Sequence, residues 1–388
     1  MKDRSLLMIP GPIEFEPAVL GAMGAPTTSH VAPDFIETFG RAIEGLREVW
    51  HAPTGQPFIL AGSGTLAMDT AGANLVEPGD RVLVLSTGVF GDRFVDLLGR
   101  YGTQVDVLRT VPGETVDFDA VRDQLASADY KLMTATHVDT STAVRVNAQT
   151  FGALGAEFGV LTILDGVCSV AGEEIRQDEW QLDVVLTASQ KAIGVPPGLA
   201  LVVAGPRAIQ AFENRTTPVQ NYYADWAKWL PIMRAYEDRR PSYFGTPAVN
   251  LVCALACSLE LILAEGMETR WARHAVIGEA MRAAIHALDL GQIPTSDDHA
   301  ANTLSAPRIP TGLEPPRLLS GIREAGVILA GGLYPELRSA YFRVGHMGAV
   351  RTGDLLATIG AIESSLASCG YPVSVGDGLR AAQHVLAA

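Results

Sequence analysis

Basic side chains are scarce in this chain of 388 residues. It has 29 lysines and arginines against 43 aspartates and glutamates, which gives a formal net charge of -14 at pH 7. A protein that binds nucleic acid needs a basic surface to meet the phosphates, so we expect no nucleic-acid partner. Lysine is the scarcest charged residue, since only four are present in the whole sequence.

Cysteines, long apolar runs and leader-like segments are also scarce or missing. The four cysteines form no CxxC pair and have no histidine nearby at metal-ligand spacing, so neither a disulfide framework nor a metal site is indicated. No apolar run reaches the length of a membrane-spanning helix. The N-terminus MKDRSLLMIPGP lacks the apolar core of a signal peptide. We therefore expect no membrane partner and a cytoplasmic location.

Apolar strands alternate with helical patterns between about residues 34 and 215. This order is typical of an α/β protein whose mostly parallel sheet is covered by helices on both faces. The predicted strands comprise residues 58–60, 81–86, 104–109, 131–138, 160–165, 183–189 and 199–205. Long helical stretches follow at 248–266 and 267–290, and a smaller α+β segment ends the chain. In such sheets ligands bind beyond the carboxyl ends of the strands.

Lys191 lies at such a strand end. The other three lysines, Lys2, Lys131 and Lys228, occupy a terminus, the polar start of a strand and a predicted helix. A lysine just past a buried strand can snorkel from the sheet edge. However, the preceding predicted strand, VLTILD, ends on Asp165. Two opposite charges at the ends of neighbouring strands favour a shared binding site.

An acid and a lysine in one crevice suit pyridoxal phosphate (PLP). The aldehyde of this cofactor forms a Schiff base with a lysine, and a buried carboxylate keeps its ring nitrogen protonated. Its phosphate needs a cradle of N–H donors. The stretch FILAGSGTLAMD offers one, because a strand leads through Gly62, Ser63, Gly64 and Thr65 into a helix N-terminus.

The same stretch leaves a second interpretation open. Gly62, Gly64 and Ala67 spell G-x-G-x-x-A, which is a weak motif for dinucleotide binding. A dinucleotide site also needs an acidic residue at the end of the next strand to hold the ribose. The run RVLVLS ends without one, so this interpretation is the weaker of the two.

Motifs along the whole chain resemble those of class V aminotransferases, most closely the fungal-type alanine–glyoxylate aminotransferase branch. They are AGSGTLAMD, STGVFGDRF, THVDTSTAV, LDGVCSVAGEE, DEWQLDVVLTASQKAIGVPPGL, YFGTP and FRVGHMG. The resemblance implies a PLP-dependent transferase of fold type I. Its expected parts are an N-terminal arm (1–15), a large PLP-binding domain (16–262) and a smaller C-terminal α+β domain (263–388). It also implies a homodimer with shared active sites.

The resemblance implies roles for individual residues. Lys191 would form the Schiff base and act as general base, and Asp165 would pair with the ring nitrogen. Arg343 would bind the substrate α-carboxylate bidentately, and the backbone of Gly11 would line the substrate pocket. The other residues implied to bind the cofactor are Ser63, Gly64, Thr65, Phe90, Thr140, Val167 and Gln190, with Tyr243 and Thr246 reaching the phosphate from the other subunit.

Some of these residues also have ordinary structural interpretations. Taken alone, Phe90 and Val167 fit positions in the core, Thr140 fits a helix cap, and Arg343 fits a surface ion pair. The joint presence of Lys191, Asp165 and Arg343 argues against a binding protein that has the fold but no activity.

The implied reaction moves an amino group from a small amino acid, alanine or serine, to glyoxylate, so the substrates are an amino acid and a 2-oxo acid. Two alternatives remain, a PLP-dependent lyase that carries out β-elimination and an aminotransferase recruited to a specialised biosynthetic pathway. Gly166 and Gly245 replace the alanines that the resemblance leads us to expect, which would widen the pocket for a larger substrate. A desulfurase is disfavoured, because residues 327–345 contain no cysteine.

Overall fold

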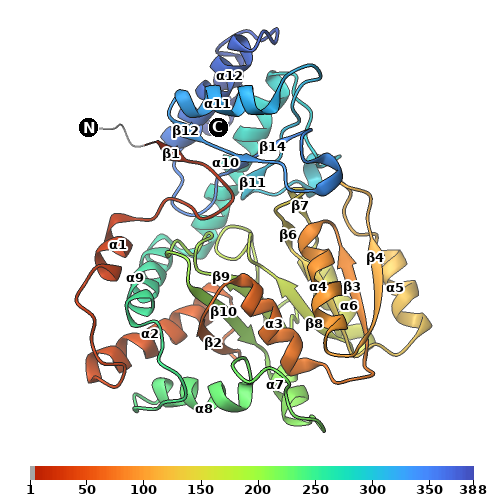
Figure 1. The fold of residues 1–388 in the computed structure, drawn as a ribbon, viewed down its shortest axis with the longest axis vertical. Coiled ribbons are helices and arrows are strands. Elements are labelled where there is room, and N and C mark those ends of the chain that lie inside the picture. The colour runs from red at the N-terminus through yellow and green to blue at the C-terminus, as the bar shows by residue number, and fades with distance from the viewer. Residues whose placement is uncertain (1–4) are drawn as a thin grey trace.

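A seven-stranded sheet forms the centre of the larger part of the molecule in the computed structural model, which describes residues 5–388 (Figure 1). The strands are β2 (Gln56–Ala61), β3 (Arg81–Ser86), β4 (Gln104–Arg109), β5 (Leu132–Thr136), β8 (Leu161–Asp165), β9 (Val184–Ala188) and β10 (Leu199–Ala204). Their order is β2-β10-β9-β8-β5-β3-β4. Strand β10 is antiparallel to β2 and β9, and all other neighbours are parallel. The predicted, mostly parallel α/β sheet is therefore confirmed.

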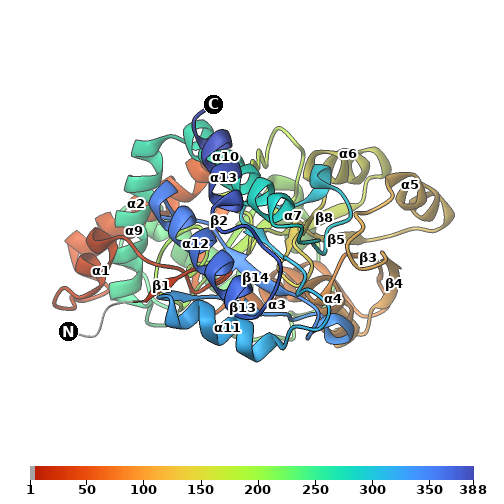
Figure 2. The ribbon, with the colours of Figure 1, turned by 90° about the horizontal axis from the view of Figure 1, so that it is seen from above.

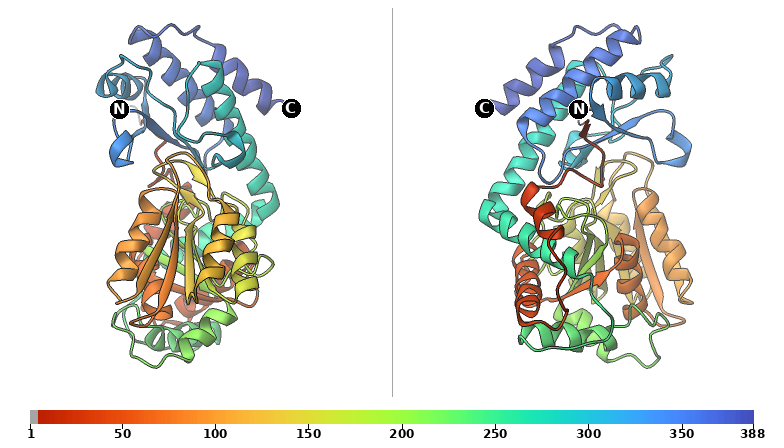
Figure 3. Two further views of the ribbon diagram at one scale, coloured as in Figure 1. Left: turned by 90° about the vertical axis from the view of Figure 1, so that its right-hand side faces the viewer. Right: turned by 60° about the vertical axis from the view of Figure 1, so that its left-hand side comes forward.

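Helices cover both faces of this sheet. The central strands β8, β9 and β10 are buried along their whole length, so each face needs an apolar cover. Helices α3 and α4 lie on one face, and α5 and α6 lie on the other (Figure 3). The helices of this part are α1 (Pro17–Met23), α2 (Pro33–Val49), α3 (Gly64–Leu75), α4 (Val89–Gly99), α5 (Phe118–Ser127), α6 (Ala148–Phe158), α7 (Pro206–Glu213) and α8 (Trp226–Glu237).

A sharp turn between two long helices leads to the smaller part. Helix α9 (Val249–Glu265) packs against α1 and α2. The chain turns at Gly266, whose φ of +83° favours glycine, and α10 (Met267–Ala287) leaves at 83° to α9. The expected boundary at residue 263 falls inside α9, close to this turn. No single described helix is long and apolar enough to cross a membrane, and only the bent pair of α9 and α10 reaches that length together.

The smaller part has its own sheet and its own hydrophobic core. Three short strands pair in the order β11-β14-β13, and α10, α12 and α13 pack together beside them (Figure 2). Its core includes Met281, Leu318, Phe342, Leu355 and Leu366. The elements are η1 (Asp297–His299), β11 (Leu304–Ser305), α11 (Pro315–Glu324), β12 (Val327–Ile328), β13 (Ala330–Gly331), η2 (Pro335–Leu337), β14 (Phe342–Gly345), α12 (Thr352–Ser368) and α13 (Asp377–Leu386).

The N-terminal segment connects the two parts across the sheet edge. Strand β1 (Leu6–Leu7) pairs in parallel with β12 of the smaller part. The chain then passes Lys191, where the N–H of Ile13 donates to the carbonyl of Gln190 at 3.3 Å, and enters α1. Residues 1–4 of the expected arm lie outside the described residues. The described arm therefore contacts the region where the sequence predicts the site.

Candidate active site

The ends of β8 and β9 bring Asp165 and Lys191 together. These strands pair in parallel, with Asp165 opposite Leu186, and Lys191 lies in the turn that follows β9. Both side chains line a cavity of about 240 Å³ at the carboxyl edge of the sheet. The other lining residues are Ser63, Gly64, Thr65, Met68, Phe90, Arg93, Thr136, Val138, Val167, Cys168 and Gln190. Most of the residues predicted to bind the cofactor therefore surround one cavity.

Asp165 has one satisfied oxygen and one free oxygen. The side chain is 1% exposed. Its Oδ1 accepts a hydrogen bond from the N–H of Val167 at 2.9 Å, whereas its buried Oδ2 has no partner among the described residues. Burial raises the pKa of Asp165 to about 7, and the charges of Arg93 and Lys191 oppose this rise. A buried carboxylate oxygen without a partner is costly, so this atom fits a cationic or N–H group of a ligand.

The N-terminal segment holds Lys191 in place. Its Nζ donates a hydrogen bond to the carbonyl oxygen of Pro10. Gly11 lies directly against this side chain with a φ of +107°, and a Cβ at that position would approach Nζ to 2.6 Å. Only glycine suits this backbone conformation and this spacing. The structure thus places the backbone of Gly11 beside the amine, although Gly11 does not itself line the cavity, and its role in the substrate pocket stays a prediction.

The start of α3 forms a cradle of backbone donors. Ser63 precedes the helix, but its side chain makes no capping hydrogen bond, so the first N–H groups of α3 have no intrahelical or capping partner. Gly64 allows this turn to approach the wall of the cavity, because a Cβ there would lie 2.9 Å from Cγ2 of Val167. The free N–H groups at this helix N-terminus fit a phosphate group. Gln190 lines the same cavity, but its buried Oε1, which has no partner among the described residues, is an acceptor and fits an N–H or O–H donor of a ligand.

Arg343 and Thr140 meet beside the cavity. Nη1 of Arg343 lies 3.3 Å from Oγ1 and 3.4 Å from the carbonyl oxygen of Thr140, and Nε donates to the carbonyl of Gly331 at 2.9 Å. Thr140 is buried in the turn between β6 (Val138–Asp139) and β7 (Val144–Arg145), so it caps no helix. Arg343 pairs with no carboxylate of residues 5–388 and stays available for an anionic ligand.

Asp139 is a supporting residue that the sequence analysis missed. Its buried carboxylate accepts hydrogen bonds at Oδ2 from the N–H groups of Phe90 (2.9 Å) and Gly91 (3.3 Å) at the start of α4. Gly88, at the N-terminus of that helix, has no side chain for this purpose. Asp139 therefore fixes Phe90 from another segment of the chain. Asp139 directly precedes Thr140, a residue predicted to bind the cofactor, and this position in the sequence could have indicated its role.

Arg93 is a second residue that the sequence analysis missed. It lies one helical turn after Phe90, with its guanidinium carbon 4.6 Å from the centre of that ring. Its Nη1 donates to Oγ1 of Thr65 at 3.0 Å. The spacing of three residues from Phe90 on one helix face could have found it.

Some predicted residues lie away from the cavity. Tyr243 is 63% exposed, and its ring lies 5.2 Å from that of His30; Thr246 in the same segment is also exposed. Gly166 does not widen the pocket, because a Cβ there would point into the core, 2.5 Å from Cγ2 of Val170. A Cβ at Gly245 would face the ring of Trp229 instead. The pocket-widening role expected for Gly166 is therefore wrong, and that of Gly245, whose segment lies outside the cavity of its own chain, stays a prediction.

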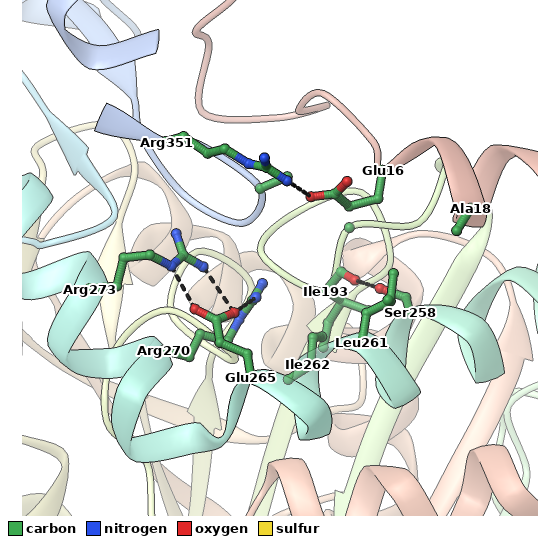
Figure 4. Close-up of a pocket in the computed structure, with 12 residues that line it drawn as sticks. Glu16, Ala18, Ile193, Ser258, Leu261, Ile262, Glu265, Arg270, Arg273 and Arg351 are labelled. Atoms are coloured by element: carbon green, nitrogen blue, oxygen red, sulfur yellow. Dashed lines mark hydrogen bonds and ion pairs between the residues drawn. The ribbon is translucent and has the colours of Figure 1, made fainter. Parts of the chain in front are cut away.

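A second cavity, of about 490 Å³, lies behind the turn that carries Lys191 (Figure 4). Glu265 accepts hydrogen bonds from both Arg270 and Arg273. Arg270 also donates to the carbonyl of Ala192 at 2.8 Å, and Ser258 donates to the carbonyl of the next residue. These contacts tie α9 and α10 to the turn directly after Lys191. The polar groups of this second cavity are paired within the protein. We call the cluster of Ser258, Glu265, Arg270 and Arg273 the joint, because it connects α9 and α10 to the turn after Lys191.

The comparison with known proteins agrees with this geometry. Residues 20–350 match the family model of class V aminotransferases. The chain therefore belongs to the class V aminotransferases, and the resemblance stated from its motifs is confirmed. This family uses PLP.

Individual relatives are similar over nearly their whole length. Alanine–glyoxylate aminotransferase 1 of Saccharomyces cerevisiae is 37% identical over 360 residues, 89% of this chain and 93% of the relative. L-aspartate–glyoxylate aminotransferase of Paracoccus denitrificans is 32% identical over 390 residues, 99% and 96% of the two chains. The crystal structure of ureidoglycine–glyoxylate aminotransferase from Bacillus subtilis superimposes with a TM-score of 0.92 at 25% identity, covering 100% and 99%. The expected fold type I is confirmed.

Proposed function

We propose that this chain is a PLP-dependent transaminase that transfers the amino group of a small amino acid, alanine or serine, to glyoxylate. The observation that carries the proposal is the pair at the ends of β8 and β9, where the unpartnered Oδ2 of Asp165 and the amine of Lys191 line one cavity. Few ligands need a buried carboxylate, a lysine and a phosphate cradle together, and PLP needs all three.

The residues divide the work as follows. The N–H groups at Ser63, Gly64 and Thr65 hold the phosphate, and Oδ2 of Asp165 accepts the hydrogen bond of the protonated ring nitrogen. Bound PLP supplies a ring that stabilises negative charge at the Cα of the substrate. Lys191 would hold the cofactor covalently, and its amine would move the proton at Cα of the substrate. The geometry around Arg343 supports its role in binding the substrate carboxylate.

The names of the relatives support small substrates. The yeast relative is an alanine–glyoxylate aminotransferase, and the Paracoccus relative is an L-aspartate–glyoxylate aminotransferase. Glyoxylate is thus the shared partner in both names, which supports it as the acceptor. A donor and acceptor screen identifies the amino donor.

We also propose that the active protein is a homodimer. Tyr243 and Thr246 are exposed and lie outside the cavity of their own chain, which supports the role in the other subunit's site that the resemblance implies. Exposed apolar side chains on α1 and α9, at Leu20, Met23 and Leu261, provide surface for such an association.

A donor and acceptor screen tests this function. Purified protein loaded with PLP should lose its visible absorbance when alanine or serine is added and regain it with glyoxylate. The products should be glycine and pyruvate from alanine. Release of ammonia and pyruvate from serine without conversion of glyoxylate would identify a β-eliminating lyase. An unchanged spectrum with alanine, serine, aspartate and glycine would contradict the proposed donors.

A further inference from the structure

Arg93 is a charged residue of the cavity that the proposed function has not used. The charged side chains lining the cavity are Lys191, Asp165 and Arg93. The first two have roles in holding the cofactor covalently and in binding its ring nitrogen. Arg93 is therefore the second cation of this lining, and its charge has no role in the proposed function.

The surroundings of Arg93 show where this charge acts. Its Nη1 donates to Oγ1 of Thr65 at 3.0 Å, so the guanidinium lies at the start of α3, where the backbone donors form the cradle. The Phe90 ring, 4.6 Å from the guanidinium carbon, supports it on one face. The remaining N–H groups of the planar guanidinium are not all used by these contacts.

Arg93 also differs from the other arginines near α4. Arg100 pairs with Asp96 on the same helix, and Arg109 pairs with Asp92. Arg93 forms no ion pair with any carboxylate among residues 5–388. An arginine that lines a cavity without a carboxylate partner has its charge available for an anion from solution.

We propose that Arg93 is the counter-ion of the cofactor's phosphate and binds it together with the N–H groups at the start of α3. This inference rests on the proposed function, because it presumes that PLP is the ligand. A helix N-terminus supplies only about half a positive charge, so a full positive charge beside it strengthens the binding of a phosphate dianion. A guanidinium supplies a full charge and two parallel donors, and it suits phosphate geometry better than a lysine does.

Comparing PLP with pyridoxal tests the proposal, because pyridoxal has the same ring and aldehyde but no phosphate. Cofactor-free protein is titrated with each compound, and binding is followed by visible absorbance and by tryptophan fluorescence. We expect R93Q to weaken PLP binding about 10- to 100-fold and to leave pyridoxal binding unchanged. R93K, which keeps the charge, should lose less. R100Q, at the exposed residue directly after α4, should bind both compounds like the wild type.

The phosphate itself provides a second readout. Inorganic phosphate should compete with PLP in the wild type, and this competition should weaken in R93Q. If R93Q binds PLP as tightly as the wild type does, the proposal is wrong. An equal loss for PLP and pyridoxal would also overturn it, because Arg93 would then only support Phe90. A raised KM for the amino donor with unchanged PLP affinity would assign Arg93 to the substrate instead.

Failure of this inference can be separated from failure of the proposed function. Wild-type protein that binds neither compound would overturn both. Wild-type protein that binds PLP normally, together with an R93Q variant of equal PLP affinity, would overturn the role of Arg93 alone.

Discussion

The two cavities on either side of the Lys191 turn contain similar polar groups and use them differently. In the cavity behind the turn, Glu265 is paired with two arginines, and the pKa of this carboxyl is lowered because those arginines outweigh its burial. In the cavity at the sheet edge, Oδ2 of Asp165 has no partner and burial raises the pKa to about 7. The paired groups around Glu265 hold the turn after Lys191 in place, whereas the unpaired Oδ2 of Asp165 can bind a ligand.

This difference explains how the lysine is presented. Contacts from Arg270 and Ser258 fix the carbonyl groups of the two residues after Lys191, and Pro10 and Gly11 restrict its side chain from the front. The joint therefore provides the rigidity that the active site needs. Substitutions at the sheet edge should change chemistry, and substitutions at the joint should change stability.

The largest effect is expected at Asp165. In D165N the ring nitrogen of the cofactor loses its carboxylate partner, and we expect the rate of the amino-transfer half-reaction to fall by about 10³-fold. Stopped-flow absorbance with a saturating amino donor measures this rate. D96N, which changes an exposed aspartate, is the control. A loss of less than tenfold in D165N would show that Asp165 does not serve the ring nitrogen.

Substitution at the joint should lower the stability of the protein. Arg270 is buried and bonds to Glu265, Ala171 and Ala192. R270M should lower the free energy of unfolding by about 3 kcal/mol, because removal of one partner leaves buried groups unpaired. Urea unfolding measures this change, and R100Q, whose ion pair is exposed, should change by less than about 0.5 kcal/mol. Equal stability of R270M and the wild type would mean that the joint is dispensable.

A smaller effect on substrate binding is expected at Arg343. R343K keeps the charge but loses the bidentate geometry. The KM for the amino donor should therefore rise about 10- to 100-fold, with a smaller change in kcat. Steady-state kinetics with the donor identified in the screen provides both constants. R351K, in the second cavity, should leave KM unchanged, and an equal rise in both variants would remove Arg343 from the substrate site.

The smallest effect, taken per pH unit, is a dependence of cofactor-free stability on pH. The pKa of Asp165 is about 7 in the folded protein, above its value of about 3.9 in an unfolded chain. The folded state therefore holds an extra proton between these values, and this contribution to stability is lost as the pH rises from about 4 to about 7. The difference in unfolding free energy between wild type and D165N should fall by about 1.4 kcal/mol per pH unit. A difference that is constant from pH 5 to 7 would contradict the raised pKa.

Features that depend on local sequence could be predicted. The continuous apolar runs indicated all seven strands of the large sheet, and the acid and lysine at two strand ends indicated the site. The reversed direction of β10 could not be predicted, because a strand buried on both faces has the same apolar pattern in either direction. Asp139 and Arg93 were missed because they bond to residues 49 and 28 positions away. The pocket-widening role of Gly166 was wrong, since the direction in which a Cβ would point is set by tertiary packing.

Covalent trapping locates the lysine that bonds to the cofactor. Protein treated with PLP is reduced with sodium borohydride, digested, and analysed by mass spectrometry to locate the modified residue. We expect modification of Lys191 in the wild type and no modification at this position in K191A. K228A should be labelled like the wild type. Labelling of Lys131 or Lys228 in place of Lys191, or no labelling of protein that binds PLP, would contradict this expectation.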